Sequence, residues 1–146
     1  MSVLTSETPL MPRRHLEFRR TSMRTPQQAR TWVGLHFAEW LVPEELIYRA
    51  AVVTSELVAN ACKFGPMDGV VTVSIRGLSG GQVEVAVHDQ GRIPRSEWLV
   101  PQLGSEHGRG LLLVEGLSSS FDVLVHSVGG KSAVAVLSPA RMGQAA

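Results

Sequence analysis

The chain has 146 residues, of which 44% are hydrophobic and 18% charged, and its formal net charge is +1. A chain of this length fits one domain that needs neither a metal nor a disulfide for stability, and its composition excludes extensive disorder. The basic residues are scattered, apart from a short run at Arg13, Arg14, Arg19 and Arg20. Composition therefore gives no support for direct nucleic-acid binding.

Cysteine content and hydropathy bear on the cellular compartment of the protein. The single cysteine, Cys62, cannot form an intramolecular disulfide, and no Cys/His spacing indicates a zinc site. The N-terminus lacks the apolar segment of a signal peptide, and no apolar run approaches the ~20 residues that span a bilayer. We therefore expect a cytoplasmic protein that makes no membrane contact, with Cys62 as a buried and inert thiol.

The predicted elements follow a short leader. Residues 1–12 mix Ser, Thr and Pro without periodicity and are expected to be disordered, and residues 140–146 are expected to form a flexible tail. Residues 13–139 would then form the folded domain. Within it, residues 14–20 alternate polar and apolar side chains, which predicts a half-buried strand.

Two helices are predicted next. Thr25 followed by Pro26 supplies an N-cap hydroxyl and a proline at the first helical position, and this helix should run to about Leu41. The second helix runs from Pro43, which two acidic residues follow, to about Phe64. One stripe of the first helix should pack inward, because its apolar residues recur at three- and four-residue steps: Ala29, Trp32, Val33, Phe37, Trp40 and Leu41.

The rest of the chain predicts two hairpins separated by a long loop and a helix. Residues 90–107 contain glycines and prolines without periodicity, and their length favours a functional loop. The order of elements is α+β, with a largely antiparallel sheet that the helices cover on one face. The remaining predicted elements are strands at 70–76, 83–89, 121–126 and 132–137, and a helix at 110–117.

Polar residues align on one face of the second helix. Arg49, Val53, Glu56, Asn60 and Lys63 fall at three- and four-residue steps. Periodicity alone favours the solvated side of an amphipathic helix. Alternatively, Glu56 and Asn60 present a carboxylate and an amide oxygen to one ligand, a pair that could polarise a nucleophile and bind Mg²⁺.

Two glycine-containing segments have both an ordinary and a functional interpretation. Asp89, before Gln90 and Gly91, is either a turn residue or an acceptor for the exocyclic amine of a ligand. Gly108 and Gly110 precede an apolar helix, where free backbone N–H groups suit a phosphate, although a flexible loop would look the same. Neither a Walker loop nor a dinucleotide-binding fingerprint is present.

Taken together, four ordered segments resemble the sequence boxes of the GHKL superfamily of ATP-binding proteins. They are Glu56 to Ala61, Asp89 to Gly91, Gly108 to Leu111 and Gly129 to Ser132. The chain is most similar to the stand-alone anti-sigma-factor serine/threonine kinases and related actinobacterial ATP-binding regulators, over roughly residues 14–138. The resemblance implies a Bergerat-type two-layer sandwich, with a mixed, mostly antiparallel sheet under helices and a lid over residues 92–107.

The resemblance also implies a role for each matching residue. Glu56 would be the general base, Asn60 the magnesium ligand, Asp89 the acceptor for the adenine amino group, and Gly91 the residue that gives the base room. Lys63 completes the candidate contacts on the second helix. The remaining matches would contact the phosphates, or in the case of Ser132 lie near adenine: Gly108, Arg109, Gly110, Leu111 and Ser132.

Two departures from the family pattern leave these roles in place. Ile93 and Pro94 stand where many relatives have a second glycine, and Phe64 stands where relatives often have histidine. The expected function is a regulator that binds ATP and Mg²⁺ and phosphorylates an antagonist (anti-anti-sigma) protein. A sigma factor, that antagonist and a second copy of the chain are the expected partners. The alternative is a nucleotide-gated binding module that performs no phosphotransfer.

Overall fold

The structure is a computed structural model that describes residues 11–64, 69–91, 106–127 and 129–140. Its order of elements is strand, two helices, hairpin, helix and hairpin, as the sequence predicts. The strands are β1 (Met11–Phe18), β2 (Val71–Gly77), β3 (Val83–Asp89), β4 (Ser120–Val125) and β5 (Lys131–Leu137). The helices are α1 (Thr25–Glu39), α2 (Glu44–Phe64) and α4 (Glu106–Leu117), with a short 3₁₀ turn, η2 (Ser79–Gly81), between β2 and β3.

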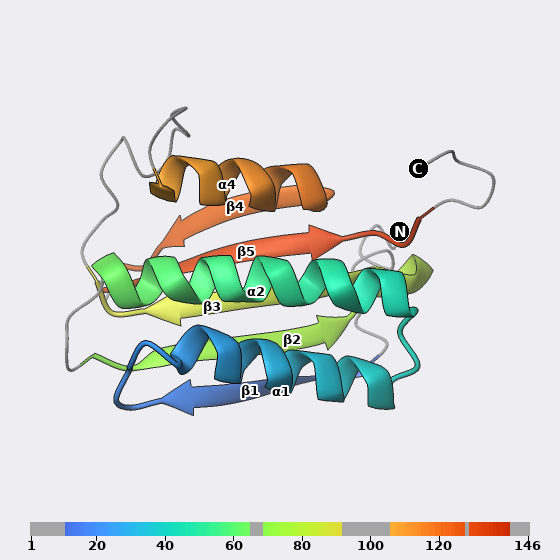
Figure 1. Cartoon of the computed structure of the whole chain (residues 1–146), viewed down its shortest axis with the longest axis horizontal. Helices are drawn as coiled ribbons and strands as arrows, with labels where there is room; N and C mark the ends of the chain where they lie inside the picture. The colour runs from blue at the N-terminus through green and yellow to red at the C-terminus, as the bar shows by residue number, and fades with distance from the viewer. Residues whose placement is uncertain (1–10, 65–68, 92–105, 128, 141–146) are drawn as a thin grey trace.

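The five strands form one sheet in the order β1-β2-β3-β5-β4. Each neighbouring pair is antiparallel, so the sheet expected to be mixed is antiparallel throughout the described strands. The helices lie on one face of it (Figure 1). The α+β two-layer sandwich predicted from the sequence is thereby confirmed.

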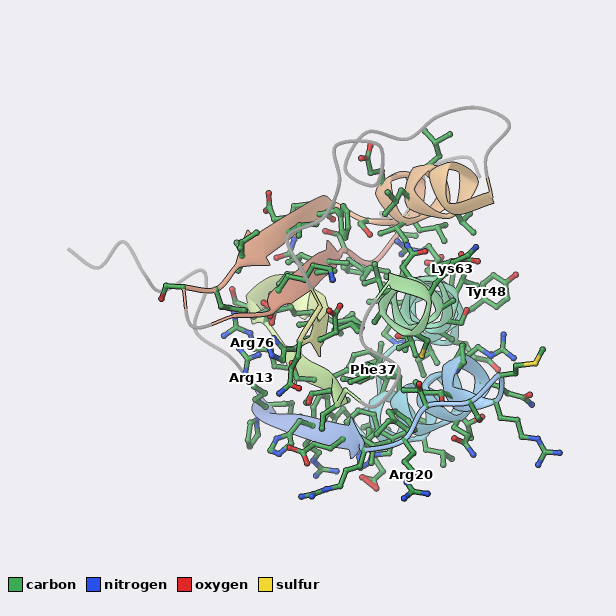
Figure 2. All side chains as sticks on the ribbon, turned by 90° about the vertical axis from the view of Figure 1, so that its left-hand side faces the viewer. Arg13, Arg20, Phe37, Tyr48, Lys63 and Arg76 are labelled. Atoms are coloured by element: carbon green, nitrogen blue, oxygen red, sulfur yellow. The ribbon has the colours of Figure 1, made fainter. Side chains whose placement is uncertain are left out.

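The hydrophobic core lies between the sheet and the helices. Strands β2 and β5 alternate buried and half-buried residues, which places every second side chain under the helices. Figure 2 shows Phe37 of α1 between the layers, whereas Arg13 and Arg76 lie on the face of the sheet that no helix covers. Val53 of α2, which the sequence placed on the polar stripe, is fully buried in this core.

Helix α1 ends two residues before the predicted boundary. Leu41 has a positive φ of 59°, and the backbone bonds from Val42 N–H to Phe37 O and from Leu41 N–H to Ala38 O close a Schellman motif. Leu41 is consequently 88% exposed rather than part of the inward stripe. Ala29, Val33 and Phe37 form the fully buried part of that stripe.

Two other elements start earlier than predicted. Strand β1 begins at Met11, so residues 11 and 12 belong to the sheet rather than to the leader. Helix α4 begins at Glu106, one turn before the predicted start at Gly110.

Arg49 of α2 holds the C-terminal end of α4. Its guanidinium group donates to the carbonyl oxygen of Leu117 at 3.3 Å and to that of Ser138 at 2.6 Å.

Candidate functional site

The predicted site residues gather at one edge of the sandwich. The C-terminal ends of α2 and β3 and the N-terminal ends of α4 and β5 meet at the left-hand side of Figure 1. Segments far apart in sequence thus come together here: Asn60 and Lys63 from α2, Asp89 from β3, Gly108 from α4 and Lys131 from β5. Four of these five residues were predicted as site residues from the sequence, and Lys131 was not.

Asp89 is the buried carboxylate of this edge. Its side chain is only 5% exposed, and its Oδ1 accepts a hydrogen bond from the backbone N–H of Gly91 at 2.7 Å. The same oxygen accepts one from the Lys131 ammonium group at 2.7 Å. The lysine side chain is 3% exposed, so the two charges form a buried ion pair.

Strand register explains why these two residues meet. Asp89 and Lys131 are directly opposite in the antiparallel pair β3 and β5. Gly130, with a φ of +88°, packs so closely that a Cβ atom there would lie 2.6 Å from the Asp89 carbonyl oxygen. Only glycine suits both the positive φ and the close approach, so Gly130 fixes the start of β5 against the end of β3.

Ser132 lies on the other face of the sheet, because successive residues of a strand point to opposite sides. Its hydroxyl group lies 3.2 Å from His88 Nδ1 and 2.8 Å from His126 Nε2. The three side chains line a pocket with Gln90 and Gly129 on the uncovered face. The structure therefore does not bring Ser132 to Asp89, and Lys131 takes the place that the sequence assigned to Ser132.

The two histidines of this cluster influence each other. Their ring centroids are 5.1 Å apart. Burial lowers the pKa of His88 below its ordinary value, and the neighbouring His126 lowers it further. His88 therefore favours its neutral imidazole form, in contrast to the ion pair on the opposite face.

Asn60 is the second buried polar residue of the site edge. It is 5% exposed, and its Nδ2 atom has no hydrogen-bond partner among the described residues. A buried amide without a partner costs about 1–3 kcal/mol, so such a group is explained best by a ligand. Rotation of the amide by half a turn presents either a donor to a phosphate oxygen or an oxygen atom to Mg²⁺.

Glu56 lies one turn before Asn60 on α2 and faces α4. A Cβ atom added to Gly110 would lie 2.7 Å from Glu56 Oε2, so the carboxylate packs against the backbone of that helix. Glycine at position 110 is what allows this approach. Two residues predicted for separate roles, the base and a phosphate contact, are therefore neighbours.

The glycine segment lies within the helix rather than before it. Gly108 and Arg109 belong to the first turn of α4, where backbone N–H groups lack helical partners and suit an anion. Gly110 is the fifth residue, so its own N–H can bond within the helix, and the Leu111 side chain is buried. The phosphate contacts expected from residues 108–111 stay a prediction, and only 108 and 109 of these lie in the first turn of α4. Ile93, Pro94 and most of the expected lid lie outside the described residues.

The remaining candidates lie at the same edge. Lys63 is exposed in the last turn of α2, and Cys62 beside it is half-buried. Burial raises the pKa of the Cys62 thiol, and the nearby Asp89 carboxylate raises it further, so the thiol is neutral near pH 7. The sequence analysis expected a buried thiol, whereas Cys62 is only half-buried, and its inertness stays a prediction.

Lys131 is the site residue that the sequence analysis did not single out. β5 begins at Lys131, one residue before the predicted strand, and Lys131 shares a face with Ala133, Ala135 and Leu137, all of which are buried. A lysine on the buried face of a strand calls for a countercharge. Asp89, at the end of the neighbouring strand, supplies it.

The donor set fits a nucleotide with a hydrated magnesium ion. Asp89 Oδ2 takes part in neither of the two bonds to Oδ1, so it can accept from an amine, and Asn60 offers an unused amide. Within the described residues no three His, Cys, Asp or Glu side chains converge on a metal site. No helix in the described part of the chain is long and apolar enough to cross a membrane.

Solved structures share this architecture. The RsbU and RsbW domains of a Mycobacterium tuberculosis protein match 90% of this chain with a TM-score of 0.61 and 22% identity. A chain of the SiaB–SiaC complex from Pseudomonas aeruginosa matches 92% with a TM-score of 0.65 and 12% identity. The histidine kinase domain of the Erythrobacter litoralis EL346 blue-light activated histidine kinase matches 65%, with a TM-score of 0.52 and 31% identity.

These matches cover unequal parts of the other proteins. The chain spans 35% of the Mycobacterium structure and 45% of the Erythrobacter domain, but 92% of the Pseudomonas chain. No curated protein sequence matches it significantly. A family model described as histidine kinase-like ATPase domain matches residues 20–136. The chain belongs to this family of histidine kinase-like ATPase domains, within the GHKL superfamily.

Proposed function

We propose that the protein binds Mg-ATP at this edge and transfers the γ-phosphoryl group to a serine or threonine hydroxyl of a partner protein. Membership of an ATPase-domain family implies ATP as the ligand. The observation that carries the proposal is the buried Nδ2 of Asn60, which has no hydrogen-bond partner among the described residues, one turn from Glu56, which packs against α4. The proposed site would combine this amide with the Glu56 carboxylate and the first turn of α4.

Contacts with the adenine at one end and with the phosphates at the other would orient the nucleotide. Asp89 Oδ2 would accept from the adenine amino group, beside the strand pairing that fixes the carboxylate. The phosphates would lie at the first turn of α4, where Gly108 exposes backbone N–H groups at the positive end of the helix dipole. Lys63, Arg109 and Asn60 are the further proposed contacts, with Asn60 as the magnesium ligand.

Glu56 would act on the acceptor hydroxyl. It would take the proton while the hydroxyl oxygen forms a bond to the γ-phosphorus and the bond to the β-phosphate oxygen breaks, leaving ADP. Bound Mg²⁺ would offset the charge that develops on the phosphates. The described chain supplies positioning and electrostatics, which are the main protein contributions to phosphoryl transfer.

A protein partner is part of this proposal. The SiaB–SiaC structure is of a complex, and the sequence boxes resemble those of anti-sigma-factor kinases. We infer that an antagonist protein carries the acceptor hydroxyl and that a sigma factor is the regulated partner, in the cytoplasm and with the kinase as a homodimer. Sedimentation of the purified protein tests the dimer.

Calorimetric titration with ATP and Mg²⁺ is the first test of binding. Wild-type protein should bind, and Asp89→Asn should bind at least about tenfold more weakly, because hydrogen bonds to a charged acceptor are worth about 1.5–3 kcal/mol. Asp122→Asn, at an exposed position on β4, is the matched control and should bind like the wild type. Absence of binding by folded wild-type protein would contradict the proposal.

Phosphotransfer is tested separately with ATP labelled at the γ-phosphate and candidate partner proteins. Glu56→Gln should retain ATP binding and lose about 10²–10⁴-fold in transfer rate, which is the usual contribution of a general base. Glu115→Gln, an exposed residue of α4, serves as the control. ATP binding without any labelled partner would instead identify the nucleotide-gated binding module.

A further inference from the structure

The Lys131–Asp89 ion pair lies where the base of the nucleotide is expected. Both side chains are nearly inaccessible, at 3% and 5%, and the ammonium nitrogen lies 2.7 Å from Asp89 Oδ1. The register of β3 with β5 and the close packing of Gly130 hold the two residues opposite each other. A buried lysine therefore contacts the carboxylate that would recognise the base.

Lys131 determines whether Asp89 meets a ligand as a carboxylate or as a protonated carboxylic acid. A buried carboxylate without a countercharge favours its protonated form, which has an O–H donor, whereas a paired carboxylate stays ionised and only accepts. The ammonium group supplies the countercharge, and the N–H of Gly91 supports the same oxygen. Oδ2 takes part in neither bond and is left to receive the ligand.

An acceptor-only carboxylate discriminates between purines. The 6-amino group of adenine donates a hydrogen bond to it, whereas the 6-oxo group of hypoxanthine or guanine in the same position would place a carbonyl oxygen against a negative charge. A protonated aspartic acid would instead donate to that carbonyl oxygen. The charge state of Asp89 thus decides which purine is accepted.

We propose that Lys131 is a specificity-determining residue, which keeps Asp89 an obligatory acceptor and so restricts the site to 6-aminopurine nucleotides. This inference rests on the proposed ATP site. Lys131 acts through Asp89 and is therefore a positioning residue.

The test is a pair of titrations, with ATP and with inosine triphosphate, on the same protein sample. Wild-type protein should prefer ATP, and Lys131→Gln should reduce the ratio of the two affinities by about tenfold, the difference between hydrogen bonds to charged and to neutral groups. Lys131→Met, which cannot hydrogen-bond to Asp89, should reduce it at least as much. Asp122→Asn, at an exposed position on β4 away from the proposed site, should leave the ratio unchanged.

The ratio separates specificity from folding, because a partly unfolded sample loses apparent sites for both nucleotides equally. An unchanged ratio in the glutamine and methionine variants would overturn the inference, even if both lost stability. A wild-type preference for inosine triphosphate would overturn it as well. If wild-type protein binds neither nucleotide, the ATP site itself is refuted, which is a different result from ATP binding with an unchanged ratio.

Discussion

Neighbouring residues of β3 and β5 have different environments on the two faces of the sheet. Asp89 and Lys131 face the helices and form a buried ion pair, whereas His88 and Ser132, one residue away on each strand, face outward in a hydrogen-bonded cluster. Both pairs lie directly opposite each other in the register of β3 with β5. A single step along a strand thus decides between a buried ion pair and a partly exposed hydrogen-bonded cluster.

The same division extends across the sheet. On the covered face, the β2 and β3 residues Val73, Ile75 and Val85 are fully buried. On the open face, Arg76 and Glu84 form an ion pair at 2.8 Å, and Arg13 donates to Ser74 at 3.2 Å. The covered face holds the core and the proposed site, and the open face carries polar pairs, of which Glu84 is itself buried.

Ile75→Ala should show the largest difference between the faces. It removes a fully buried side chain, and we expect a loss of about 2–5 kcal/mol in the free energy of unfolding. Ser74→Ala, the preceding residue on the open face, should change it by only about 0.5 kcal/mol. Urea denaturation of both variants makes the measurement, and equal losses would show that the open face is also covered in solution.

Gly130→Ala should have the next largest effect. The added Cβ atom would lie 2.6 Å from the Asp89 carbonyl oxygen at a φ of +88°, so we expect a loss of about 1–3 kcal/mol in unfolding free energy. Gly129→Ala is the matched control, since its φ is also positive at +104° but nothing lies within 4 Å of the added atom. A loss no greater than that of the control would mean that the strands separate easily at this point.

The smallest expected effect concerns the histidine cluster. Because burial and His126 lower the pKa of His88 below 6.5, the folded state binds fewer protons than the unfolded state as the pH falls through that value. This contribution to stability is present above pH 6.5 and lost below it. The unfolding free energy of wild-type protein should therefore fall more between pH 7.5 and 5.5 than that of His88→Gln. Asp89 and Lys131 are the other charged groups that act on the pKa of His88. Parallel denaturation curves at both pH values make the comparison, and identical pH dependence would exclude the cluster as its source.

Local sequence patterns predicted the elements well and their contacts less well. Hydrophobic periodicity located every described helix and strand, because it records which side of each element faces the core. Asn60 was placed correctly on α2, but its burial was not predictable, since it depends on packing far along the chain. The early end of α1 at Leu41 was also missed, because a leucine in the left-handed region carries none of the usual glycine signal.

Prediction of the site was limited in the same way, by contacts between residues far apart in the sequence. Glu56, Asn60 and Asp89 were recognised from the motifs in which they occur, and their roles stay predictions. The partner of Asp89 was not recognised, because the register that joins it to Lys131 links residues 42 positions apart. The alternation along β5 places Lys131 and Ser132 on opposite faces, whereas the pairing of Lys131 with Asp89 depends on the register between the strands, which no short motif encodes.

The fastening of α4 by Arg49 has a mechanical consequence. With Leu117 held at one end, the helix would respond to a ligand at its other end as a lever turning about that point. Its twelve residues give an arm of about 16 Å, so a rotation of about 10° would move the first turn by about 3 Å. The half-exposed Leu112 and Leu113 lie on this helix. A tilt of α4 on occupation of the site would therefore also move these two side chains at the surface.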